Sequence, residues 1–311
     1  MTDTAQHRPE IARALRFIAE NLERSITVAD AARAAHLSQF HFHRVFHAAV
    51  GEPIGRFITR RRLELAALRL AYEPDRSITD VALSSGYSST SNFSKAFAAH
   101  FGCSPSRVRH PELGLPVSIG RVAAVYGKNF RPEDLYTLPP ERGADERRRE
   151  AAEWGARVRF ETSAGLDFAC LASPGGYDLA TLEKTWSELI AAARQLGLCE
   201  DAVDAWGIAH DSPQVTAPEL CRYHACVPCL PEQPMPPPLF RGGMRAGRYA
   251  VFRYTGEVAG VAEAYRSIYS CWFVESRLAP EDFTPLEHYV ADGPREGCVE
   301  LEIWFKVRPR R

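Results

Sequence analysis

The sequence predicts two folded units of different class: an all-α first domain with two helix-turn-helix motifs, and an α+β second domain built from two pseudo-symmetric strand/helix halves. Three observations predict this arrangement. The chain has 311 residues, about twice the usual size of one domain. A short motif occurs twice before residue 110, and strand-like segments alternate with helical ones after residue 156. We expect a first domain at 8–110, a linker at 111–156 that contains a solvated helix from Glu141 to Glu153, and a second domain at 157–309 with helical segments from Leu179 to Leu196 and from Val258 to Ser276.

Composition and charge indicate a globular protein with one basic domain. Hydrophobic residues make up 45% and charged residues 25% of the chain. No apolar run approaches the ~18 residues of a membrane-spanning helix, and the polar N-terminus lacks a signal segment, so we expect a cytoplasmic protein without a membrane partner. Residues 1–110 carry 15 Lys and Arg against 10 Asp and Glu, whereas the remainder carries 23 against 29. The first domain is therefore the one expected to meet a polyanion.

A repeat with a shift of 51 residues organises the first domain. It places Phe93 on Phe42, and the residues around them match in the same way. Each copy begins with a short helix that has a hydroxyl N-cap, Thr27 or Thr79, then turns and starts a second helix at a serine. This spacing is typical of a helix-turn-helix motif.

The second helix of each copy has one apolar and one polar face. Phe42 and Phe46 are four residues apart and are expected to pack on the core, so their neighbours point outward. Arg44 can bind guanine with two hydrogen bonds, and Phe40 can contact a thymine methyl. A solvated face is the alternative for either helix alone, but two such helices in a basic domain favour DNA binding. The candidate DNA-binding residues are Phe40, His43, Arg44 and His47 in the first copy and Thr90, Ser91, Ser94 and Lys95 in the second.

The segment from Pro53 to Tyr72 reads as a rigid helix connecting the two motifs. It contains five arginines among apolar residues at helical spacing. These arginines either contact DNA phosphates or pair with acidic neighbours such as Glu64 and Glu73. The sequence leaves both interpretations open.

The second motif resembles the signature of the AraC/XylS transcription regulators. The resemblance rests on the run from Ile78 to Phe97, ITDVALSSGYSSTSNFSKAF, followed by Phe101-Gly102, Pro105 and Arg109. It covers roughly residues 8–110 and implies two recognition helices that enter successive major-groove segments of double-stranded DNA. The candidate residues above fall where that family contacts DNA. The second helix departs from the family by carrying small hydroxyl residues where relatives often have longer amides. We also expect RNA polymerase as a partner.

The C-terminal part repeats itself with a shift of 81 residues, which places Tyr249 on Phe168 and Gly256 on Gly175. Each half reads as a strand, a glycine-containing turn and a helix. Segments such as Gly247–Gly256 and Pro285–Tyr289 make residues 157–309 resemble the GyrI-like effector-binding domains. The resemblance implies a cleft for bulky, cationic or aromatic small molecules, with Glu287 as the glutamate that opposes their charge.

Strand alternation from Pro285 to Tyr289 places Glu287 and Tyr289 on one face and Leu286 and His288 on the other. A carboxylate among aromatic rings can bind an organic cation through its charge and the ring quadrupoles. A solvated Glu287 and plain core tryptophans are the alternatives. The candidate effector-binding residues are Glu287, Tyr289, Trp186, Trp206, Tyr223, Trp272 and Trp304.

The principal function predicted is a DNA-binding transcription regulator that senses a small-molecule effector, with no cofactor, metal or catalytic residue. One alternative is a GyrI-like hydrolase that uses Glu287 and a neighbouring tyrosine as an acid/base pair. Another is an acidic protein-interaction module without a ligand. Cys221, Cys226 and Cys229, with His224 between them, have metal-ligand spacing, but the segment reads as a strand with cysteines serving as small apolar residues.

Overall fold

The computed structural model describes residues 9–109, 143–174, 176–199, 203–290 and 298–310. The chain divides into two compact units, each described here by itself. The first is helical, as predicted, and holds α1 (Pro9–Asn21), α2 (Val28–Ala34), α3 (Gln39–Val50), α4 (Ile54–Tyr72), α5 (Ile78–Ser84), α6 (Thr90–Phe101) and the short 3-10 helix η1 (Arg107–Arg109).

Side-chain caps start the first helix of each motif. Thr27 caps α2 and forms a reciprocal capping box with Asp30. The N-cap of α5 is Ser77, which accepts a hydrogen bond from the Asp80 backbone, so the expectation that Thr79 caps this helix is wrong. Thr79 instead lies inside the first turn, because the preceding serine already satisfies the exposed backbone donors.

The second helices of the two motifs begin and end in the same way. Ser38 caps α3 and Ser89 caps α6, as the repeat predicts. Both helices end at a glycine in the left-handed conformation, Gly51 with φ 81° and Gly102 with φ 70°. A side chain at either position would be strained, which explains why the repeat retains glycine there.

Helix α4 connects the two motifs, and its arginines bind protein groups. The buried Arg60 lies 2.6 Å from Glu52 and 3.0 Å from Glu64. Arg69 donates to the Ser84 carbonyl at 3.0 Å. Of the two interpretations left open, pairing within the protein therefore describes these arginines, and the exposed Arg56 remains available to phosphate.

The second unit contains an antiparallel sheet with helical segments beside it. Its elements are α8 (Ala144–Arg157), β1 (Arg159–Ser163), β2 (Leu166–Ser173), α9 (Leu179–Gln195), β3 (Ala205–Ala209), η5 (Pro218–Leu220), β4 (Tyr223–Pro228), β5 (Phe240–Met244), β6 (Gly247–Glu257), η6 (Val258–Gly260), α10 (Val261–Ser267), η7 (Ile268–Phe273), β7 (Leu278–Pro280), β8 (Leu286–Tyr289) and β9 (Cys298–Pro309).

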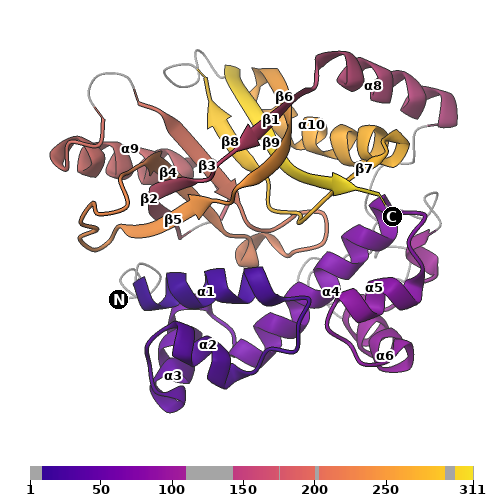
Figure 1. Cartoon of the computed structure of the whole chain (residues 1–311), viewed down its shortest axis with the longest axis horizontal. Coiled ribbons are helices and arrows are strands. Elements are labelled where there is room, and N and C mark those ends of the chain that lie inside the picture. Colours follow the sequence, from indigo (N-terminus) through magenta and orange to yellow (C-terminus); the bar gives the residue numbers. More distant parts are fainter. Residues whose placement is uncertain (1–8, 110–142, 175, 200–202, 291–297, 311) are drawn as a thin grey trace. The chain divides into compact units, whose positions relative to one another are not determined.

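The strand order β1-β6-β9-β8-β3-β4-β2-β5 reads as two matching halves that meet between β8 and β3 (Figure 1). One half provides β2, α9, β3 and β4, and the other provides β6, α10, β8 and β9. The strand that precedes each half in the chain, β1 or β5, pairs with the outer strand of the other half. This exchange ties the halves together and places β3 and β8 at the centre of the sheet.

Two segments differ from their predicted form. The helix expected in the linker is α8, but it packs in the second unit, where the Trp154 indole donates to Ser267 at 2.9 Å and its ring lies 5.7 Å from Phe252. The stretch 258–276, predicted as one helix, is divided among η6, α10 and a π-helical segment, η7. A π-helix turns its side chains out of α-helical phase, and η7 thereby buries Trp272 together with Phe273.

None of the helices in the described ranges combines the length and the hydropathy required to cross a membrane.

Candidate functional sites

The predicted DNA-reading face of α3 is exposed. Phe42 and Phe46 are fully buried, with ring centroids 5.4 Å apart, and fix the opposite face of the helix to the core. All four candidates of the first motif point to solvent, and the Phe40 ring is 77% exposed although it is apolar. The exposed candidates are Phe40, His43, Arg44 and His47.

Helix α6 presents a less open face. Ser91 and Lys95 are exposed, whereas Thr90 and Ser94 are half-buried. The Thr90 hydroxyl lies 3.3 Å from that of Thr79. Asn92 is also exposed, and its amide is a base-reading group that the sequence analysis did not select. The sequence contained a signal for Asn92, because a residue directly before the core residue Phe93 lies off the buried face of the helix.

A second site lies at the centre of the sheet, where three tyrosines converge on one carboxylate. Glu287 on β8 is 7% exposed. One carboxylate oxygen, Oε1, accepts from Tyr265 at 2.8 Å, and the other, Oε2, accepts from Tyr223 at 3.0 Å and Tyr289 at 2.8 Å. The hydroxyls of Tyr223 and Tyr289 are 2.9 Å apart. We call these four residues the Glu287 hub.

The hub draws on both halves of the domain. Tyr223 comes from β4 of the first half, whereas Tyr265 comes from α10 of the second half. Gly207 on β3 pairs with Glu287 across the boundary between the halves. A side-chain carbon at Gly207 would collide with the Tyr223 hydroxyl, so only glycine leaves room for the carboxylate and this phenol together.

The hub has a buried floor and partly exposed aromatic walls. Glu287 and Tyr223 are buried, whereas Tyr265 and Tyr289 are half-buried. The half-buried Trp186 on α9 meets the Tyr289 ring edge-to-face at 5.3 Å. Tyr265, Tyr289 and Trp186 thus form a partly exposed aromatic wall beside the buried carboxylate.

The three phenols of the hub stay protonated. Burial, followed by the charge of Glu287, raises the pKa of Tyr265 and of Tyr289 well above the usual value. Burial, followed by the neighbouring Tyr289 and Glu287, does the same to the pKa of Tyr223. Protonated phenols are hydrogen-bond donors, so they satisfy the oxygen atoms of the buried carboxylate.

Trp206 and Trp304 do not join the hub. Trp206 pairs across the strands with His288 and stacks on its ring at 4.3 Å. Trp304 lies 5.3 Å from Trp206 on the same face, and its indole donates to Glu302. Because neighbouring residues of a strand point to opposite faces, the side of His288 is the side away from Glu287. These two tryptophans therefore pack on the opposite face of the sheet.

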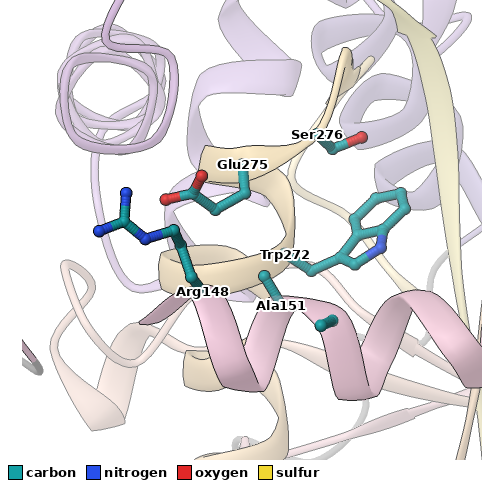
Figure 2. A pocket seen from close by; sticks show the side chains of 6 residues that line it. Arg148, Ala151, Trp272, Glu275 and Ser276 are labelled. Carbon is teal, nitrogen blue, oxygen red and sulfur yellow. The ribbon is translucent and has the colours of Figure 1, made fainter. Parts of the chain in front are cut away.

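Trp272 also lies apart from the hub. It lines a pocket of about 390 Å³ between α8 and the end of η7, with Arg148 and Glu275 at its rim (Figure 2). The indole packs on Phe252 with ring centroids 4.9 Å apart. The structure therefore places Trp272 in the packing beside α8 and not at the hub.

Among the described residues, no group of three or more His, Cys, Asp or Glu side chains is arranged to hold a metal ion. His224 and Cys226 lie on one face of β4, and Cys221 precedes that strand. The cysteines of this segment are not joined in disulfides.

Tyr265 and Gly207 belong to the hub but were not among the residues predicted from the sequence. A signal for Tyr265 was present, because the internal repeat places Trp186 near it, and both lie on the helix of their half. Gly207 carried no signal, since its role depends on a tyrosine from one neighbouring strand and a glutamate from the other.

Known proteins resemble the two units separately. Residues 31–110 match the helix-turn-helix domain family, and residues 157–308 match the GyrI-like small molecule binding domain family. The transcriptional activator AarP of Providencia stuartii is 35% identical over 104 residues, which cover 33% of this chain and 76% of AarP. The regulatory protein SoxS of Salmonella typhimurium is 31% identical over 104 residues, which cover 33% of this chain and 96% of SoxS.

A solved structure of a hydrolase from Listeria innocua covers 49% of this chain and 92% of that protein, with 10% identity and a TM-score of 0.37. A likeness this low carries no argument about activity.

Two tandem helix-turn-helix motifs on a connecting helix, followed by a sheet domain with an acidic and aromatic hub, define a DNA-binding regulator with a small-molecule domain. The chain belongs to the AraC-type family of transcription regulators, and its C-terminal unit is a GyrI-like small-molecule binding domain.

Proposed function

We propose that this regulator reads DNA with the exposed faces of α3 and α6 and senses an organic cation with an aromatic body at the Glu287 hub. One observation carries the effector class: a buried carboxylate is held by three protonated phenols beneath a partly exposed aromatic wall. A cation gains from the charge of the carboxylate and from the ring faces together, whereas a neutral molecule gains only from the rings. An anion is repelled.

The proposed DNA contacts divide into two kinds. Arg44 on α3 reads a base, because the guanidinium can bind guanine through two hydrogen bonds. Lys95 on α6 contacts a phosphate, because its point charge carries no sequence information. The exposure of both side chains on their helices supports this division. We further propose RNA polymerase as the partner through which DNA binding becomes regulation.

The effector proposal is tested on the full chain by calorimetry with two matched probes. The cation is (2-naphthylmethyl)trimethylammonium, and its neutral isostere is 2-neopentylnaphthalene, which has carbon in place of nitrogen. Glu287→Gln keeps the shape of the side chain and removes the charge. We expect it to weaken cation binding by about 1–2 kcal/mol and to spare the isostere.

The matched control is Glu263→Gln on α10, which removes an equal charge two residues from Tyr265 at an exposed position paired with Arg266. It is expected to leave both affinities unchanged. Equal losses for both probes in Glu287→Gln, or no loss for either, would overturn the charge role of Glu287.

We propose that the hub binds its effector without converting it. Each oxygen of Glu287 accepts a hydrogen bond from a phenol, and these contacts support a carboxylate that is held in place to attract a cation. Recovery of the probe unchanged, as judged by mass spectrometry after prolonged incubation with the full chain, is the expected result. A new product whose formation requires Glu287 would instead support the hydrolase alternative.

A further inference from the structure

Two cysteines lie directly opposite each other in the sheet of the second unit. Cys170 on β2 pairs with Cys226 on β4 in the antiparallel register, and both residues are fully buried. The thiol of Cys226 donates toward the Cys170 sulfur at 3.1 Å. Directly paired residues of antiparallel strands have Cα atoms ~4.5–5.5 Å apart, which is a separation that a disulfide can span. A bond between these sulfurs therefore needs little movement of the backbone.

We propose that Cys170 and Cys226 form a reversible dithiol/disulfide pair that hydroperoxides oxidise, independently of the effector hub. Both cysteines lie on the face of the sheet opposite Tyr223, since residues 223 and 226 are an odd number of positions apart along β4. Oxidation of this pair therefore acts on the second domain from the face of the sheet opposite the Glu287 hub.

The hydrogen bond between the thiols sets the order of the steps. Cys226 donates to Cys170, and burial raises the pKa of Cys226 well above the usual value, which keeps that residue in the thiol form. The Cys170 sulfur accepts that hydrogen bond and lies against Gly242 of the edge strand β5. Cys170 is thus the sulfur that attacks the peroxide.

The reaction balances with one hydroperoxide. The Cys170 sulfur attacks a peroxide oxygen, and the O–O bond breaks. For hydrogen peroxide, the departing hydroxide takes the proton of the Cys170 thiol, which gives water and a sulfenic acid on Cys170. The Cys226 sulfur then attacks the Cys170 sulfur and expels its hydroxyl group, which takes the proton of Cys226 to form a second water. Two thiols are oxidised to a disulfide, and the peroxide is reduced to two waters.

A small oxidant can reach Cys170 through the edge of the sheet. The sulfur lies against Gly242 on β5, where a side-chain carbon would collide with it. β5 is the last strand in the strand order and pairs only with β2 within the described sheet, and Gly243 beside it is exposed. Edge strands fray more easily than central ones, and two glycines offer no side chains to block the path.

The best internal comparison is Cys229, directly after β4. It is half-buried, and Arg241 donates to its sulfur at 3.3 Å. Exposure alone would make Cys229 the first of these thiols to be oxidised. Geometry instead predicts that Cys170 and Cys226 become linked to each other, because a disulfide needs a partner in register.

The experiment treats the full, folded chain with hydrogen peroxide, blocks the remaining thiols with iodoacetamide in denaturant, and maps the peptides by mass spectrometry. We expect a linked peptide containing Cys170 and Cys226, lost on treatment with dithiothreitol and still formed in Cys229→Ser. Blocked Cys170 and Cys226 in the peroxide-treated wild type, or a dominant link from Cys229 to either of them, would overturn the proposal.

A thermal melt of the wild type provides a second measurement, with Cys170→Ala as its control. A cross-link restrains the unfolded chain, so the oxidised wild type should melt higher by about 3 °C or more and return to its original value on reduction. Cys170→Ala should abolish this shift. An unchanged melting temperature, despite a mapped link, would show that the bond forms only in unfolded chains.

Discussion

Gly207 and Glu287 are directly paired across β3 and β8, and the absence of a side chain on the glycine makes room for the Tyr223 hydroxyl to reach the carboxylate. This pairing lies at the boundary between the two halves of the domain. The hub therefore depends on a residue that has no side chain.

Gly207→Ala should disrupt the hub. The added carbon would collide with the Tyr223 hydroxyl, so the phenol has to leave Glu287 or the strands have to separate. Overpacking of this kind costs about 1–3 kcal/mol of unfolding free energy. Chemical denaturation of the full chain measures it, and binding of the naphthyl cation should fall in parallel.

Gly55→Ala is the matched control for Gly207→Ala. Gly55 lies in α4 with open space around its missing side chain. Alanine is the better helix former, so this variant should gain about 0.5–1 kcal/mol. Losses of equal size in both variants would mean that the effect of Gly207→Ala does not come from the collision in the hub.

Arg44→Ala should reduce DNA binding in a sequence-dependent way. The binding site is first selected from random DNA with the full chain, and affinity is then measured by fluorescence anisotropy on specific and scrambled duplexes. Loss of a base contact costs about 1–3 kcal/mol on the specific duplex and relaxes the preference at one base pair. Lys95→Ala should weaken both duplexes more evenly.

Arg148→Ala on α8 is the control for the two DNA-binding variants, because it removes an equally exposed positive charge from the second unit. Its DNA affinity should stay at the wild-type value. If Arg44→Ala weakened both duplexes equally, Arg44 would be a phosphate contact.

His100 should make the protein less stable in mild acid. Burial, followed by the charge of Arg60, lowers the pKa of His100 to about 4. The unfolded chain then takes up a proton below about pH 6.5 while the folded chain does not, so the unfolding free energy falls between pH 6.5 and 4. The upper limit of this loss is about 3.4 kcal/mol. His100→Leu should flatten that part of the stability profile, and parallel profiles for variant and wild type would contradict the assignment.

His288 should have the opposite dependence on pH. Burial alone would lower its pKa, but hydrogen bonds to Asp204 at 2.9 Å and to Glu302 outweigh this and raise it. A histidine with a raised pKa in the folded state stabilises the protein below about pH 6.5, and this contribution is lost as pH rises through the folded value. Asp204→Asn should bring the His288 titration, followed by NMR, closer to that of an ordinary histidine. A titration midpoint unchanged by the substitution would show that Asp204 does not hold the proton.

The first unit could be predicted almost completely from the sequence. Both helices of each motif start at a side-chain cap, and α3 and α6 end at glycines, so the repeat places these signals in both motifs. Such signals act within a few residues of the chain, so they can be read without knowing the tertiary fold. The cap of α5 is the exception, because two hydroxyl residues near the start of the helix competed for the position.

The second unit was predictable within each strand but not between strands. Alternation correctly placed Glu287 and Tyr289 on one face, and the structure joins them by a hydrogen bond. The short β3 and the glycine-rich β5 carried too few β-branched or aromatic residues to be recognised as strands.

The sequence by itself determined the two helix-turn-helix motifs, the order of the domains and the side of β8 that carries Glu287. Only the tertiary structure decided that Tyr265 joins Glu287 while Trp206 packs on the opposite face. The physical reason is that alternation fixes which residues of one strand share a face, whereas the face that a second strand or helix presents to them depends on register and crossover. Those are set by contacts between residues that lie far apart in the chain.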